Sequence, residues 1–373
     1  MNNSIVKFGF TKLCIILLLL FTSFNCKPQK EVVDGKKVSI GIINPGVGSL
    51  RGFADLVENQ VLNIRDLQFV AICYEKAERN HTRVEDYIEQ RNDQLFRFKL
   101  VEGDLNYGDL FNKNNLSDNF KNIFNETDGL FFLGGADFPP AIYKDKTSLL
   151  TNIITPHRHY FELSFLFHLL GGSQDTSFTP LLSQNDSYVI IGFCLGMQSI
   201  NVATGGSMYQ DIPFDIYGVR YVEDVLELNP DQQHQNYWQN MIPDDQMIWA
   251  NFHRIKQIGA HHIFDDELWK ENKTPFVYSS HHQAVKEKGL NINIIATSMD
   301  NKVPEIIGHE IYDNVFGVQF HPEVSSLYNE HGGRFKWTPE DTLGKSYYSF
   351  LHENNSYRFH QKFWGNIGDI FTE

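Results

Sequence analysis

The sequence predicts an α/β domain with a mainly parallel central sheet covered by helices on both faces. Short runs rich in β-branched and aromatic residues alternate with longer stretches of helical spacing, which is typical of a three-layer architecture. Apolar residues make up 42% of the chain and charged residues 21%, an ordinary globular composition. After residue 37 there is neither a repeat nor a linker, so we expect one globular domain over residues 38–373.

The expected elements follow from the spacing of apolar residues. The helix that begins at Leu195 should stop before Gly205 and Gly206, because glycine favours the conformation that ends a helix. Residues 213–275 are polar, rich in Gln, His and Trp, and weakly periodic, so the sequence assigns no element there and leaves the role of this segment open. The expected strands are 38–44, 69–73, 128–133, 188–192, 292–296, 305–311 and 315–320, and the expected helices are 53–64, 157–170 and 195–204.

The N-terminus resembles an export signal. Two lysines precede an uncharged run at residues 13–25, which is shorter than the roughly 20 apolar residues of a transmembrane helix. Cys26 follows directly, as in bacterial lipoprotein signals, so residues 1–26 are predicted to be a signal peptide and residues 27–37 a tether. We expect an exported protein: periplasmic or a membrane-anchored lipoprotein if bacterial, otherwise secreted. Plain secretion without lipid on Cys26 stays open.

The net charge excludes two classes of partner, and the cysteine count argues against a disulfide-stabilised fold. A formal net charge of −14 repels nucleic acid and anionic membranes, so we expect neither as a partner, except for membrane contact through an N-terminal lipid. Four cysteines are too few and too scattered for a disulfide framework, and Cys73 is expected to be buried in a strand. The sequence leaves a homodimer open.

The segment Gly192-Phe193-Cys194-Leu195-Gly196 predicts a nucleophile elbow, a sharp turn between a strand and a helix. Small neighbours allow the strained backbone, and the thiol then stands at a helix N-terminus, which favours the thiolate. The amide of Leu195 points to where an oxyanion would form. The alternative is a buried cysteine in an ordinary turn.

The pair His321 and Glu323 closes a β-rich run late in the chain. Residues two apart on a strand share a face, so the carboxylate can orient the imidazole while its other nitrogen faces a thiol. Taken alone, such a pair is often only a surface ion pair.

Two further segments bear on the chemistry. Gly134 and Gly135 follow an expected strand, where backbone amides can approach a ligand; a tight loop is the alternative. His281 and His282 are adjacent, but the sequence offers no ligand partners at metal spacing beside the histidine pairs. We therefore expect no metal and interpret the pair as part of a rim loop that positions substrate.

With these segments in order, the chain resembles the class I glutamine-amidotransferase-like superfamily, and within it the gamma-glutamyl hydrolase and gamma-glutamyl-gamma-aminobutyrate hydrolase group. Four blocks carry the resemblance: LGGADFPP, GFCLGMQSINVATGGSMYQDI, SSHHQAV and GVQFHPE. It covers roughly residues 38–345 and implies a flavodoxin-like, three-layer fold. Leu133 departs from the proline usual before the double glycine, and an export signal is unusual for this group.

The resemblance implies a role for each matching residue. Cys194 would be the nucleophile, His321 the general base and acid, and Glu323 its orienting carboxylate, while Gly135 and Leu195 would supply the oxyanion-hole amides. The implied reaction is hydrolysis of a γ-glutamyl amide through a γ-glutamyl thioester, with no cofactor.

The implied substrate is a small γ-glutamyl compound. Gln198 would help to seat the glutamyl group, and Gly134, His281 and His282 would also contact substrate. A glutaminase module of an amidotransferase and a catalytically silent binding protein on the same fold are the alternatives. The sequence does not identify the leaving amine.

Overall fold

A ten-stranded mixed sheet forms the centre of the fold in the computed structural model, which describes residues 37–77 and 81–372. The strand order is β3-β2-β1-β4-β5-β12-β11-β10-β7-β8, and β6 pairs with β9 separately. The strands are β1 (Val38–Ile43), β2 (Leu67–Tyr74), β3 (Phe96–Val101), β4 (Gly129–Phe132), β5 (Val189–Phe193), β6 (Met208–Tyr209), β7 (Asn251–Gln257), β8 (Phe276–Ser279), β9 (Ala284–Val285), β10 (Ile292–Ser298), β11 (Pro304–His309) and β12 (Val315–Val318).

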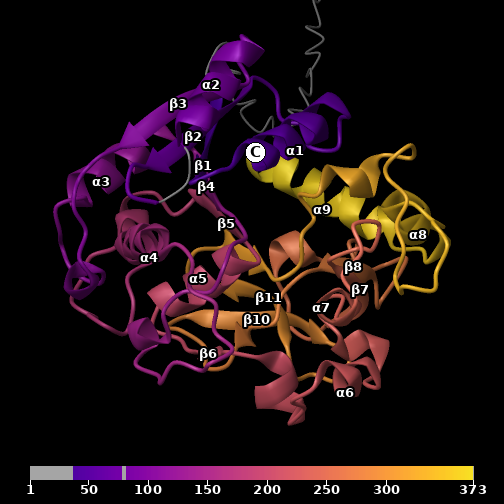
Figure 1. Cartoon of the computed structure of the whole chain (residues 1–373). Helices are drawn as coiled ribbons and strands as arrows, with labels where there is room; N and C mark the ends of the chain where they lie inside the picture. Colours follow the sequence, from indigo (N-terminus) through magenta and orange to yellow (C-terminus); the bar gives the residue numbers. More distant parts are fainter. Residues whose placement is uncertain (1–36, 78–80, 373) are drawn as a thin grey trace, which may run out of the picture. The chain divides into compact units, whose positions relative to one another are not determined.

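The sheet has a parallel half and an antiparallel half. From β3 to β12 all neighbouring strands are parallel, whereas β11, β10, β7 and β8 continue the sheet in antiparallel pairs. The predicted α/β class with a mostly parallel sheet flanked by helices is thus confirmed (Figure 1).

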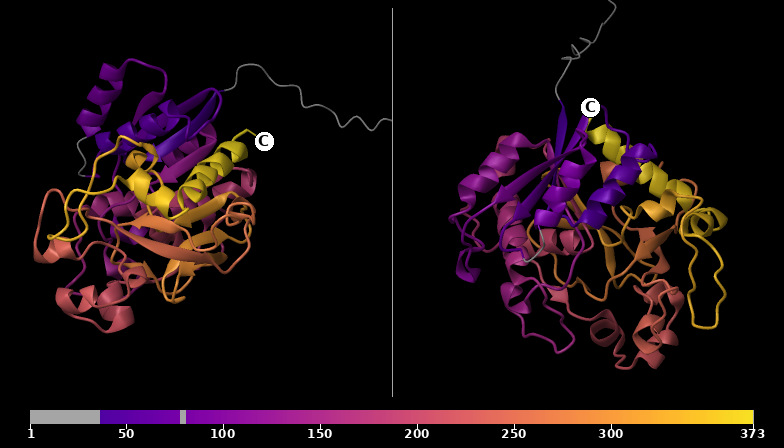
Figure 2. Two further views of the ribbon diagram at one scale, coloured as in Figure 1. Left: turned by 90° about the vertical axis from the view of Figure 1, so that its right-hand side faces the viewer. Right: turned by 45° about the horizontal axis from the view of Figure 1, so that its top comes forward.

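Helices cover both faces of the sheet, as Figures 1 and 2 show. Residues alternate along each parallel strand: in β4, Phe131 belongs to the core shared with α1 and α9, while Leu130 and Phe132 belong to the core shared with α3, α4 and α5. Both layers are aromatic-rich; Phe53 of α1 meets Trp364 of α9 edge to face with ring centroids 6.3 Å apart. The α-helices are α1 (Val47–Glu58), α2 (His81–Arg91), α3 (Ser117–Glu126), α4 (Pro156–Leu170), α5 (Leu195–Ala203), α6 (Val222–Leu226), α7 (Trp238–Met241), α8 (Tyr347–Glu353) and α9 (Tyr357–Ile370).

Two expectations need correction, and the structure defines a segment that the sequence left open. Helix α1 begins at Val47 and ends at Glu58, so the predicted span 53–64 was displaced toward the C-terminus. The open segment, residues 213–275, contains α6, α7 and β7. Strand β12 ends at Val318, so His321 and Glu323 do not lie on a strand and do not share a strand face.

The described chain from Lys37 onward forms one compact unit. No helix in residues 37–77 and 81–372 is long and apolar enough to cross a membrane. The predicted signal peptide, most of the predicted tether and Cys26 lie outside the described residues.

Candidate active site

Cys194 lies in the sharp turn between β5 and α5. Its backbone has φ 50° and ψ −106°, a strained conformation for a residue that carries a Cβ. A Cβ on Gly192 would lie 2.5 Å from the carbonyl oxygen of Gly196, and one on Gly196 would lie 2.7 Å from the carbonyl carbon of Phe132. The two glycines therefore make this turn sterically possible, and the thiol stands at the N-terminus of α5 as the sequence predicted.

His321 and Glu323 come together although the strand has ended. His321 Nδ1 lies 2.7 Å from Glu323 Oε1, which leaves Nε2 for the thiol. The loop is held from outside: Pro322, between the two, accepts hydrogen bonds on its carbonyl from Tyr328 Oη at 2.8 Å and Trp364 Nε1 at 3.1 Å. Its anchoring, rather than strand geometry, sets the His-Glu contact.

The environment of His321 favours its charged form. Burial lowers the pKa of the imidazole, but the Glu323 carboxylate and then the Cys194 sulfur, which is also hydrogen bonded to the ring, outweigh burial and hold the pKa well above its usual value. A protonated His321 beside Cys194 can donate to a leaving group.

Gly134 and Gly135 border the same place. A Cβ on Gly134 would lie 2.8 Å from His321 Cε1 and 3.5 Å from Cys194 Cβ, and one on Gly135 would lie 2.9 Å from Leu195 Cδ2. Leu195 is the first residue of α5, so its amide has no acceptor within the helix. The structure thus brings together the predicted nucleophile, the His-Glu pair and both predicted oxyanion-hole residues. They lie at one edge of the sheet, at the carboxyl ends of β4, β5 and β12.

The loop at Gly134 and Gly135, here called the glycine loop, rests on a buried ion pair that was not predicted from the sequence. Arg158 of α4 is 1% exposed, donates from Nη2 to the carbonyls of Leu133 and Gly134 at 3.1 Å each, and pairs with the fully buried Glu162 through Nε at 2.7 Å. Asn44 donates to the same Glu162 oxygen at 3.1 Å. The available signal was an Arg and a Glu four residues apart in a helix rich in Phe and Leu.

The side chain of Gln198 is linked to the thiol through one intervening residue. Its side chain is buried and donates to Gln319 Oε1 at 3.2 Å, and Gln319 Nε2 in turn lies 3.6 Å from Cys194 Sγ. Gln319 is therefore a second residue beside the sulfur that the sequence analysis did not single out.

The adjacent histidines have different surroundings. His282 lies between Asp137 and Asp211, at 3.1 Å and 3.2 Å, and it lines a cavity of about 800 Å³ with Arg220 and Tyr237. Burial lowers the pKa of His282, but its bonds to Asp137 and Asp211 raise it overall to about 9. The lining of this cavity does not include Cys194; it adjoins the glycine loop through His282 and Asp137.

His281 does not face that cavity. Its side chain is buried against His234 and His253, with ring centroids 4.9 Å and 6.4 Å away. Of the two histidines expected at a substrate rim, His282 lines this cavity and His281 does not.

The chain is similar to known proteins over much of its length. The model of the Peptidase C26 family matches residues 76–323. Of the site residues named above, Asn44, Tyr328 and Trp364 lie outside this range. The glutamine amidotransferase-like protein YvdE of Lactococcus lactis is 25% identical over 209 residues, which cover 56% of this chain and 71% of that protein. Protein NtpR of Enterococcus hirae is 28% identical over 209 residues, 55% of this chain and 70% of its own. Among solved structures, a glutamine amido transferase from Methylobacillus flagellatus covers 89% of this chain and 93% of its own length, with a TM-score of 0.36 and 12% identity.

Proposed function

Because this chain belongs to the peptidase C26 family of glutamine amidotransferase-like hydrolases, we propose that it cleaves the γ-glutamyl amide bond of a γ-glutamyl amine or peptide. One observation carries the proposal: the strained Cys194 lies beside a His321 that is oriented by Glu323, with Gly134 next to both side chains. Nucleophile, proton donor and backbone amides are the parts that acyl transfer to water requires.

The proposed mechanism begins with the Cys194 sulfur attacking the γ-carbonyl carbon. The amides of Gly135 and Leu195 stabilise the oxyanion, and the protonated His321 donates its proton to the departing amine nitrogen as the C–N bond breaks. The products of this half are a γ-glutamyl thioester and the free amine. Water, deprotonated by His321, then cleaves the C–S bond and releases glutamate.

The γ-glutamyl acyl group is supported by the four sequence blocks and by the charges of the cavity next to the glycine loop. A γ-glutamyl group carries an α-carboxylate and an α-ammonium. Arg220 and Asp211, both in the cavity lining, offer charges complementary to these two groups. His282 joins the same wall, so the substrate-positioning role proposed for it is compatible with its place.

The test is turnover of γ-glutamyl-p-nitroanilide, of a panel of γ-glutamyl amines and of glutamine by the purified protein. We expect Cys194→Ala to abolish turnover and Cys73→Ala, at the other buried cysteine among the described residues, to retain it. A γ-glutamyl adduct on Cys194 detected by mass spectrometry supports the thioester. Turnover that survives Cys194→Ala refutes the mechanism, glutamine as the sole substrate favours a glutaminase, and no turnover with no adduct favours a binding protein.

We also propose export, with lipid on Cys26, on the sequence pattern of residues 1–26 alone. Labelling with a palmitate analogue in a bacterial host should mark the wild type and not Cys26→Ser. Equal labelling of the two would contradict lipidation, and recovery of the unprocessed chain in the cytoplasm would contradict export.

A further inference from the structure

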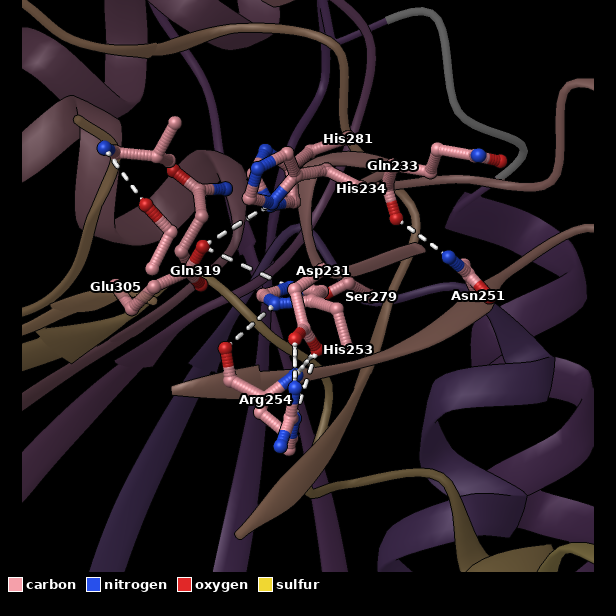
Figure 3. Close-up of polar contacts among 12 residues, drawn as sticks. Asp231, Gln233, His234, Asn251, His253, Arg254, Ser279, His281, Glu305 and Gln319 are labelled. Atoms are coloured by element: carbon pink, nitrogen blue, oxygen red, sulfur yellow. Dashed lines mark hydrogen bonds and ion pairs between the residues drawn. The ribbon is translucent and has the colours of Figure 1, made fainter. Parts of the chain in front are cut away.

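Four buried side chains converge beside the antiparallel half of the sheet (Figure 3). His234 follows a short 3-10 helix (Pro230–Gln232), His253 lies on β7, His281 follows β8, and Glu305 lies on β11. His234, His253 and Glu305 have no exposed surface, and His281 is 4% exposed. One potential ligand atom from each of the four lies within 4.8 Å of the others.

These side chains lack the hydrogen bonds that their burial demands. Both ring nitrogens of His234, Nε2 of His281 and both carboxylate oxygens of Glu305 form no hydrogen bond within the described chain. Buried polar groups are normally satisfied, and an unpaired buried carboxylate is the most unfavourable case. Five unsatisfied atoms in one cluster therefore indicate a missing partner that contacts them together.

The tautomers of two histidines indicate the charge of that partner. His281 Nδ1 lies 2.9 Å from the carbonyl of Gln283, and His253 Nδ1 lies 3.3 Å from the carbonyl of Arg254. A carbonyl only accepts, so Nδ1 carries the hydrogen and, in the neutral ring, Nε2 presents a lone pair. Both Nε2 atoms face Glu305 Oε1, at 3.6 Å for His253 and 4.0 Å for His281. Lone pairs that face a carboxylate oxygen call for a cation between them.

We propose that His234, His253, His281 and Glu305 form a binding site for one Zn²⁺ ion. Zinc takes nitrogen and oxygen ligands at about 2.0–2.2 Å in a tetrahedron, whose edges are then roughly 3.3–3.6 Å long. Glu305 Oε1 lies 3.2, 3.6 and 4.0 Å from the nearest nitrogens of His234, His253 and His281. Small side-chain shifts close this set, and the Nδ1–carbonyl bonds are the outer contacts that orient zinc-binding imidazoles.

The surrounding contacts hold the ligands in place. Asp231 and Arg254 form a bidentate ion pair, and Asn251 Nδ2 donates to the carbonyl of Gln233 at 2.6 Å, which fixes the segment before His234 to β7 (Figure 3). Ser279 Oγ lies 2.9 Å from His253 Nε2, so its hydroxyl donates to that lone pair until a metal replaces it.

The site is closed, which makes it a structural site rather than a place where water is activated. It lies next to the thiol region: the amide of Gln319 donates to the carbonyl of Glu305 at 2.8 Å, and Gln319 Nε2 contacts Cys194 Sγ. This proposal departs from our sequence expectation of no metal. The ligands are spread over 72 positions with no short spacing motif, so pattern reading of the histidine pairs could not assemble them.

The experiment measures zinc in the tag-free protein after dialysis against a metal-free buffer. We expect about one zinc per chain, X-ray absorption showing nitrogen and oxygen ligands without sulfur, and Co²⁺ substitution giving the intense visible bands of a tetrahedral ion. Glu305→Gln and His234→Gln should lower zinc affinity at least tenfold. Ser279→Ala should retain zinc, as should His309→Gln, a buried histidine on the same strand as Glu305.

Cys194→Ser separates this site from adventitious zinc on the thiol and should also retain zinc. If the ligand variants fail to fold, the wild type alone decides: removal of the metal by a chelator should lower the melting temperature, and Zn²⁺ should restore it. Wild type that binds less than about a tenth of an equivalent in excess zinc, a sulfur ligand in the absorption spectrum, or folded ligand variants that keep full affinity would each overturn the proposal.

Discussion

The buried ion pair under the glycine loop allows the sharpest quantitative prediction. Arg158→Met keeps most of the side-chain volume but removes the guanidinium, which leaves Glu162 fully buried with the side-chain amide of Asn44 as its remaining hydrogen-bond donor among the described residues. Breaking a buried ion pair on one side costs about 3–5 kcal/mol of unfolding free energy, because the remaining charge is uncompensated. That is a large share of the 5–15 kcal/mol that typically stabilise a protein.

The double variant Arg158→Met/Glu162→Leu tests the reason for that cost. It removes both charges, and it leaves unsatisfied the amide of Asn44 and the carbonyls of Leu133 and Gly134. Each such buried group costs about 1–3 kcal/mol at most, and carbonyls can regain partners by small shifts. We therefore expect the double variant to be more stable than Arg158→Met, although less stable than the wild type.

Activity should not follow stability in this pair. Both variants lose the guanidinium that holds the Leu133 and Gly134 carbonyls, so both should show the same decrease in kcat. Urea unfolding followed by far-UV circular dichroism and tryptophan fluorescence gives the free energies if the two transitions coincide. A double variant no more stable than Arg158→Met, or wild-type kcat in either, would refute this account.

Three further predictions concern the thiol, the histidine and its loop. Gly196→Ala should lower activity by about 100-fold or more and stability by about 1–3 kcal/mol, because the new Cβ overlaps the Phe132 carbonyl; Gly365→Ala in α9, with open space around it, is the control and should cost nothing. Glu323→Gln should move the basic limb of the kcat/KM profile to lower pH, since Glu323 raises the pKa of His321; a limb that stays in place contradicts this. A raised folded-state pKa contributes stability that is fully present below about pH 6.5 and lost as pH rises through the folded value, so the stability gap between wild type and Glu323→Gln should narrow at alkaline pH. Trp364→Phe should cost about 1–3 kcal/mol and lower kcat, because it removes one of the two donors to the Pro322 carbonyl between His321 and Glu323; Trp249→Phe, 65% exposed, should change neither, and equal effects of the two would disprove the anchoring.

The sequence predicted those parts of the fold and site that local pattern determines. The elbow at Cys194 could be recognised because the strand, the two glycines and the helix are contiguous. Strands β1, β2, β4, β5 and β12 could be recognised because they are largely apolar runs, and β10 and β11 because their residues alternate or are β-rich. Arg158 could not be assigned, because a charged residue in a helix normally faces water, and only the tertiary structure shows that α4 is buried nearly all round.

Strand β7 shows why the elements within residues 213–275 could not be predicted from the spacing of apolar residues. Its buried positions include Asn251 and His253. Asn251 is hydrogen bonded to Trp337 and to the carbonyl of Gln233, and His253 contacts Ser279 and Glu305. Hydrophobic periodicity detects burial only where the buried residues are apolar. In β7 the buried Asn251 and His253 are polar and contact other polar groups. The sequence pattern therefore does not reveal this segment as a strand.

The division of the sheet into two halves bears on how specificity is built. The parallel half supplies Cys194, the glycine loop and Arg158, while the antiparallel half and its connections supply Tyr278, whose carbonyl accepts from the His321 amide at 2.8 Å, and the four-residue cluster. The cavity that adjoins the glycine loop is lined chiefly by residues 211–240. We therefore expect a change in that segment, whose sequence is the least regular in the chain, to alter how the substrate is held without moving the thiol.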